Sequence, residues 1–199
     1  MASLREEKKR ATRQAMADAA ARLVLDGGAE AATISGITAA VGVSPRTFHN
    51  YFSSVADALL YFTADVLESF AADIPSVCPG KSVTAVLEAA LLESLEDEEK
   101  KLRSLHTLYR IGEALDNLSH TSEERRRFER VSDTIISAFQ QQGTDYTDYE
   151  LGVVLSACAG GSVAFRKEMD RRQAAGETVS LADKKKLAQS VFSVLRTLD

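Results

Sequence analysis

The sequence contains few of the residues that interrupt helices or cross-link small proteins. Its 199 residues include three prolines, two cysteines and no tryptophan. Two cysteines are too few for a disulfide framework, so we interpret Cys78 and Cys158 as ordinary small residues in a reducing compartment. No apolar run approaches the roughly 18 residues of a membrane span, and the charged N-terminus lacks the apolar stretch of a signal peptide. These absences predict a cytoplasmic protein without a membrane anchor.

The residues that carry catalysis are also scarce. The three histidines, His49, His106 and His120, have no metal-ligand spacing with one another or with a cysteine. The sequence contains no nucleophile elbow, phosphate-binding loop or glycine-rich dinucleotide motif. The acidic run at 96–99 is typical of a solvated helix junction. We therefore expect no catalytic residue, metal or cofactor, and no enzyme activity.

Alanine, leucine, glutamate, lysine and arginine dominate long stretches, and these residues favour helices. Apolar residues recur at three- and four-residue steps, which indicates amphipathic helices. Capping residues mark several helix starts, including Thr121. The segment 74–82, with two prolines and a glycine, is the clearest break. The sequence predicts an all-α fold of about nine helices, at 3–26, 34–41, 45–51, 55–73, 82–96, 98–118, 122–142, 148–174 and 180–198.

The charge is distributed unevenly along the chain. The net charge is −5, which by itself argues against a nucleic-acid partner. Residues 1–52, however, hold seven basic and five acidic side chains, a net +2, and the remainder carries −7. A basic head on an acidic body indicates two functions in one chain.

Residues 34–51 have the parts of a helix-turn-helix. A short apolar helix is followed by Gly42, which allows a tight turn, and then by a second short helix that starts at Pro45. Ile37, Val41, Val43 and Phe48 can form the inner face. The residues left for a DNA groove or its walls are Ser44, Pro45, Arg46, Thr47, His49 and Asn50.

This stretch resembles the DNA-binding head of the TetR family of transcriptional regulators. The resemblance covers about 50 residues and is carried by Thr33, Ile34, Ile37, Ala40, Gly42, Val43, Ser44, Thr47, Phe48, Tyr51, Phe52 and Leu59. It departs at His49, where the family usually has an aromatic residue, and at Val55, where lysine is common. The resemblance implies a DNA-binding domain at 1–53 and an effector-binding and dimerisation domain at 54–199.

Individual roles on DNA follow from chemistry together with the resemblance. Arg46 is the best candidate for a guanine contact, and the alternative is a solvated or phosphate-bound arginine. Pro45 and Thr47 are placed to touch a thymine methyl group. The expected phosphate contacts, some of which also cap helices or line a solvated helix face, are Lys8, Lys9, Arg10, Arg13, Thr33, Ser44, His49, Asn50 and Tyr51. For Asn50 the alternative is a contact with an adenine edge.

The body is expected to form a homodimer and to bind a ligand. Residues 151–165 carry almost no charge and include two adjacent glycines. We expect a dimer interface at Leu155, Ala159, Gly160, Val163, Leu187, Val191 and Leu195, with an intrachain core helix as the alternative. A small apolar or amphipathic effector is expected to contact Phe62, Val66, Phe70, Leu91, His106, Tyr109 and Arg110, several of which can equally be core residues.

The sequence thus predicts a ligand-responsive regulator, a repressor by family resemblance, that binds a palindromic double-stranded DNA operator as a homodimer. The other interpretation is a helical protein-interaction adaptor with a weakened DNA-binding head.

Overall fold

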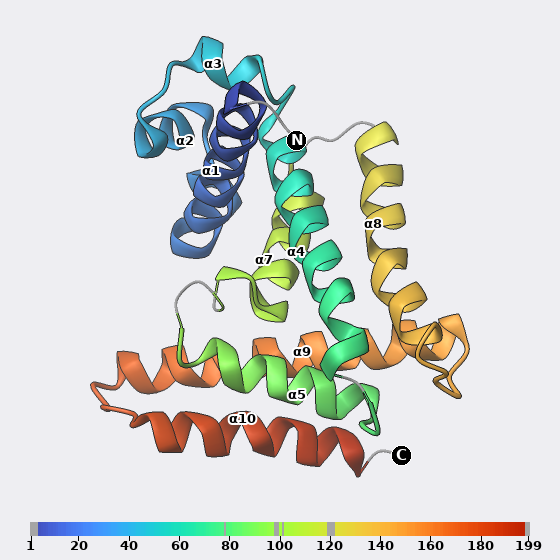
Figure 1. The fold of residues 1–199 in the computed structure, drawn as a ribbon. Helices are drawn as coiled ribbons and strands as arrows, with labels where there is room; N and C mark the ends of the chain where they lie inside the picture. The colour runs from blue at the N-terminus through green and yellow to red at the C-terminus, as the bar shows by residue number, and fades with distance from the viewer. Residues whose placement is uncertain (1–3, 78, 98–99, 101, 119–121, 198–199) are drawn as a thin grey trace. The chain divides into compact units, whose positions relative to one another are not determined.

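The computed structural model describes residues 4–77, 79–97, 100, 102–118 and 122–197, and every regular element among them is helical (Figure 1). This confirms the all-α fold class. Within this part of the chain there are nine α-helices and one short 3₁₀ helix, η1 (Ala29–Ala31). The α-helices are α1 (Leu4–Gly27), α2 (Ile34–Val41), α3 (Pro45–His49), α4 (Val55–Val77), α5 (Val83–Ser94), α7 (Leu105–Asn117), α8 (Ser122–Gln140), α9 (Asp148–Ala174) and α10 (Leu181–Arg196).

Side-chain caps fix several helix starts where the sequence predicts them. The Thr33 hydroxyl accepts the Gly36 N–H, and the Ser180 hydroxyl accepts the Asp183 N–H. Thr147 and Glu150 form a complete capping box at the start of α9. Each cap satisfies backbone N–H groups that the first helical turn leaves without a partner. The predicted cap at Thr121, together with Cys78 and His120, lies outside the described residues.

Two predicted boundaries are wrong. Helix α4 continues past residue 73 and through Pro75 to Val77. Pro75 lies in the last turn, where a missing N–H removes only one helical hydrogen bond, and the continued helix keeps Ile74 fully buried. The segment predicted as one helix at 98–118 is interrupted before Leu105. There the Ser104 hydroxyl accepts the Thr107 N–H at 3.3 Å and starts α7.

The described residues divide into two compact units. The first comprises those of Met1–Leu67 and Arg110–Val131, and the second those of Glu68–Tyr109 and Ser132–Asp199. The core of the first unit contains the fully buried side chains of Met16, Ile37, Phe48, Phe52 and Leu59. The helices α1 and α2 pack against each other there, and α2 contacts α3.

The second unit is built on three mutually packed helices, α5, α9 and α10 (Figure 1). Leu87 on α5, Cys158 on α9 and Phe192 on α10 are fully buried. Burial raises the pKa of the Cys158 thiol to about 11, so this thiol is protonated at neutral pH. Cys158 therefore acts as a packing residue, as predicted.

The close approach of α9 and α10 depends on Gly161. A Cβ atom placed there would lie 2.4 Å from Cγ1 of Val191, closer than two carbon atoms can come. Ion pairs add to the same three-helix layer: Arg196 pairs with Glu88 at 2.8 Å, and Lys185 pairs with Glu96. The absence of a side chain at position 161 thus lets two helices of one chain pack closely.

Candidate nucleic-acid interface

The turn between α2 and α3 is set by backbone geometry and capping. Gly42 has φ 72° and ψ 34°, a left-handed conformation that costs glycine nothing and strains other residues. The Val43 N–H donates to the carbonyl of Thr38 and closes the end of α2. Ser44 then caps α3 by accepting the Thr47 N–H at 3.1 Å, and Pro45 occupies the first turn. The predicted helix-turn-helix is therefore present at the predicted residues.

Phe48 anchors α3 to the body of the first unit. Its side chain is fully buried, and its ring lies 5.7 Å from that of Phe52. With one side of so short a helix held inward, its other side must face water. Pro45, Arg46 and His49 are exposed, and Thr47 is half-buried.

Helix α3 is shorter than predicted, because it ends at His49 rather than at residue 51. Asn50 is the C-cap residue, and its N–H donates to the carbonyls of Arg46 and Thr47. Its side chain is exposed, whereas Tyr51 lies in the following turn and is half-buried. Both residues therefore lie beyond the helix on which the sequence places them.

The hydroxyls of Thr33 and Ser44 cap α2 and α3. Each accepts a backbone N–H as a helix cap, and the Ser44 hydroxyl also shares a hydrogen bond with that of Thr47 at 2.9 Å. Both side chains remain exposed. A hydroxyl that caps a helix can still meet a phosphate, so capping and DNA contact are compatible roles.

The basic residues of α1 fall into two groups. Lys8, Lys9 and Arg10 are exposed. Arg13 is half-buried, and the central carbon of its guanidinium lies 4.2 Å from the ring centre of Tyr61 and 5.2 Å from that of Phe52. Sequence reasoning grouped Arg13 with its neighbours by charge and did not identify Tyr61, because no local pattern reveals contacts between α1 and α4.

The residues expected to bind an effector are distributed over both units. Phe62, Val66 and Arg110 belong to the first, and Phe70, Leu91, His106 and Tyr109 to the second. Phe62, Val66 and Leu91 are buried, and Tyr109 is exposed. Arg110 forms an ion pair with Glu113.

The residues expected at a dimer interface are mostly in contact within the chain. Val191 and Leu195 pack on Gly161, and Leu155, Ala159, Val163 and Leu187 are half-buried. Gly160 differs from them, because it is exposed and a Cβ atom there would meet nothing within 4 Å. It lies on an outward stripe of α9, the α9 stripe, formed by Tyr149, Val153, Ser156, Ala157, Gly160 and Ala164.

Neither a metal-binding cluster nor a membrane-spanning helix occurs in the part of the chain that the structure describes. Among the described residues, no three histidine, cysteine, aspartate or glutamate side chains come together in a way that could hold a metal ion. Within the same residues, no helix has both the length and the apolar character needed to cross a membrane.

Residues 17–60 match the family model described as "Bacterial regulatory proteins, tetR family". The head belongs to the TetR family. The matched range spans the end of α1, the helix-turn-helix and the start of α4. This part of the chain is thus a TetR-family helix-turn-helix DNA-binding domain, and the matched range ends at residue 60.

Two solved structures share the fold over nearly the whole chain. One is the transcriptional regulator FadR from Bacillus subtilis in complex with stearoyl-CoA, with 14% identity and a TM-score of 0.59, covering 90% of this chain and 95% of that one. The other is a putative transcriptional regulator from Rhodococcus sp. RHA1, with 18% identity and a TM-score of 0.57, covering 93% and 95%. A comparison with curated proteins found no match. At these identities the likeness concerns the fold.

Proposed function

We propose that this TetR-family protein is a repressor that binds a palindromic operator as a homodimer and releases it when a small effector binds. The observation that carries the proposal is the two-sided character of α3. Phe48 fixes the inner side of this helix, and Pro45, Arg46 and His49 are presented on the outer side. A recognition helix needs both features, because its polar side chains must reach base edges from a fixed position.

Base reading is assigned to Arg46, with Pro45 and Thr47 beside it. The guanidinium of arginine can donate two parallel hydrogen bonds to O6 and N7 of guanine in the major groove. Contacts to the DNA backbone are assigned to the exposed side chains of Lys8, Lys9, Arg10, Thr33, Ser44, His49 and Asn50, and to Tyr51. These contacts position the head without reading sequence.

The homodimer is proposed to form through the α9 stripe and the adjoining outer side of α10. Val153 is 51% exposed, and Val194 on α10 is 60% exposed. The exposed residues of α9 from Val153 to Ala164 carry no charge, and Glu150 borders them beside Tyr149. Gly160 weakens helix formation by about 1 kcal/mol relative to alanine, and no contact among the described residues explains why a glycine stands there. The close approach of a helix from a partner chain would explain the glycine at position 160.

The effector is proposed to be apolar or amphipathic, because the expected contacts combine phenylalanine, valine and leucine with His106, Tyr109 and Arg110. FadR was solved with stearoyl-CoA, which has a long apolar tail and a charged head group. We use it as a first probe for this chain. An effector that favours a conformation with misplaced heads must weaken DNA binding by the same coupling factor, about 5- to 150-fold.

The proposal is tested by fluorescence anisotropy with a labelled mixed-sequence duplex at low and moderate salt. We expect binding that weakens steeply with salt, because each phosphate contact adds about 0.9 to the slope of log K against log salt concentration. Stearoyl-CoA is then added, with free CoA as the control. Absence of binding at the lowest salt concentration would contradict a DNA-binding function. Unchanged binding with stearoyl-CoA would remove that compound as an effector.

A further inference from the structure

Arg13 differs from the other basic residues of α1 in its surroundings. Lys8, Lys9 and Arg10 are exposed, whereas the Nε atom of Arg13 is buried and has no hydrogen-bond partner. Its guanidinium is covered instead by two rings, those of Tyr61 at 4.2 Å and Phe52 at 5.2 Å from their centres. Both distances lie within the roughly 6 Å over which a cation is attracted to an aromatic face.

This arrangement is unsuited to a phosphate contact. An arginine that binds a phosphate presents its N–H groups to the anion in a planar fork. In Arg13 the planar group lies against ring faces and its Nε–H is buried, so the fork that combines Nε–H with an Nη–H cannot meet a phosphate while the group stays on the rings. Leaving the rings is unfavourable, because the attraction between a cation and a ring grows as water is excluded.

One of the two rings that cover Arg13, that of Phe52, is also in contact with the buried anchor of the recognition helix, α3. Phe52 lies 5.7 Å from Tyr61 on one side and 5.7 Å from Phe48 on the other, measured between ring centres. Phe48 is the buried anchor of α3, and its ring also meets that of His49 edge-on at 5.7 Å. Arg13, Tyr61, Phe52 and Phe48 thus form one continuous group, the Arg13 stack, running from α1 and α4 to the underside of α3.

A second contact holds the same two helices together. Next to Arg13, the side-chain amide of Gln14 donates to Asp65 on α4 at 3.2 Å and to Asp18 on α1 at 2.9 Å. Asp65 lies one helical turn beyond Tyr61. Two neighbouring residues of α1 therefore contact α4: Arg13 through the ring of Tyr61, and Gln14 through the carboxylate of Asp65.

We infer that Arg13 is a positioning residue for DNA recognition, which fixes α3 through Phe52 and Phe48 and makes no phosphate contact. The inference rests on the proposed DNA-binding function. When the guanidinium of Arg13 is removed, Phe52 and Phe48 are held less firmly. A smaller fraction of the DNA-binding heads then has α3 in the orientation that binds DNA. Apparent affinity falls in proportion to that fraction, while the number of phosphates neutralised in each complex stays the same.

The test uses the full-length protein and the duplex that it enriches from a random library. Affinities are measured across a salt series for wild type, Arg13→Met and Arg10→Met, the matched control on the same helix. For Arg13→Met we expect roughly tenfold weaker binding with an unchanged salt slope. For Arg10→Met the slope should fall by about 1. If the salt slope of Arg13→Met fell by as much as that of Arg10→Met, the inference would be overturned.

Substitutions at Tyr61 separate positioning from a loss of folding. Tyr61→Phe keeps the ring face and should retain wild-type affinity, whereas Tyr61→Leu should weaken binding as Arg13→Met does. The double variant should lose less affinity than the sum of the two single losses, because both substitutions remove the contact between Arg13 and Tyr61. Additive losses would contradict the inference. All affinities are taken at temperatures where unfolding curves show each variant folded. A wild-type protein that binds no duplex would instead refute the proposed function itself.

Discussion

At the scale of single residues, local chemistry predicts most of the head. The caps at Thr33 and Ser44, the turn at Gly42 and the buried Phe48 all follow from short-range rules, and the structure places them as predicted. Arg13 is the exception, because its environment is made by Phe52 and Tyr61, which are distant in sequence. Charge alone could not separate it from Arg10.

Arg46→Ala should relax sequence specificity without affecting folding. The side chain is exposed, so its removal should leave the free energy of unfolding within about 0.5 kcal/mol of wild type. Discrimination at one base pair of each half-site should fall by about 1–3 kcal/mol. Competition binding with duplexes that vary that base pair measures the change. Equal loss on every duplex would reassign Arg46 to a phosphate.

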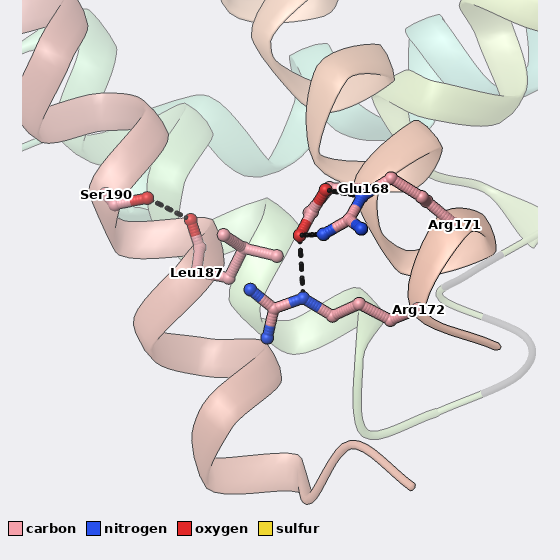
Figure 2. Close-up of polar contacts among 5 residues, drawn as sticks. All are labelled: Glu168, Arg171, Arg172, Leu187 and Ser190. Atoms are coloured by element: carbon pink, nitrogen blue, oxygen red, sulfur yellow. Dashed lines mark hydrogen bonds and ion pairs between the residues drawn. The ribbon is translucent and has the colours of Figure 1, made fainter. Parts of the chain in front are cut away.

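Glu168 should make the second unit sensitive to acid. Its carboxylate accepts two hydrogen bonds from Arg171, both at 2.8 Å, and one from Arg172 at 2.7 Å (Figure 2). The hydrogen bonds from Arg171, followed by the one from Arg172, lower the pKa of Glu168 to about 2. The folded pKa of Glu168 lies below the unfolded value of about 4.3, so the ionised carboxylate stabilises the folded state. This contribution to the free energy of unfolding is complete above pH 5. It is lost as the pH falls towards 2.

The measurement is urea unfolding of wild type and Glu168→Gln between pH 2 and pH 7. We expect the wild type to be the more stable protein at pH 7, and the two curves to converge towards pH 2. High salt should also reduce the difference, because the side chains of Glu168, Arg171 and Arg172 are only partly buried and their charges are therefore screened. A difference that persists unchanged at pH 2 would show that the carboxylate charge contributes nothing.

At the scale of elements, helix type and order were predictable and helix ends less so. Periodicity identified the long helices, whereas the break before Leu105 depends on Ser104, whose capped partner is Thr107 rather than an acidic residue. The extension of α4 through Pro75 depends on the burial of Ile74, which is a tertiary effect. Boundaries shift where packing outweighs local preference.

The adjacent glycines of α9 should respond oppositely to substitution by alanine. Gly161→Ala places a Cβ atom 2.4 Å from Val191 and must push α10 away, which should destabilise the fold by about 1–3 kcal/mol. Gly160→Ala meets nothing within the chain and should stabilise the protomer by about 1 kcal/mol. Chemical unfolding at several protein concentrations compares the two. Similar effects at both positions would contradict the α9–α10 packing described here.

At the scale of the whole molecule, the DNA-binding head was predictable from the sequence, whereas the effector-binding and dimerisation roles of the remainder stay predictions. The basic head proved to be a TetR-family domain. Of the residues expected to pair two chains, Gly160 is exposed and the other six are half-buried. Val191 and Leu195 of α10 pack on Gly161 within the same chain. Helical periodicity shows that a face is apolar but not which helix covers it.

Val153→Glu should separate the proposed dimer into protomers. The substitution places a charge on the α9 stripe at a side chain that is 51% exposed in the single chain, so folding of the protomer should be unaffected. Desolvating that charge at an interface is unfavourable. Sedimentation velocity should show the wild type as a dimer and the variant as a monomer, with Lys167→Glu, beyond the uncharged stripe, as the control. A variant that remains dimeric would place the interface elsewhere.

The most direct test of the account is selection of bound sequences from a random double-stranded DNA library by the purified protein. The account predicts an enriched palindrome whose half-sites lie about one helical turn, ~34–36 Å, or a multiple of it apart. Each half-site should contain a G·C pair that Arg46→Ala no longer selects. Enrichment of a single half-site would contradict the dimer. No enrichment, even at low salt where phosphate contacts are strongest, would contradict the central claim that the exposed side of α3 reads DNA.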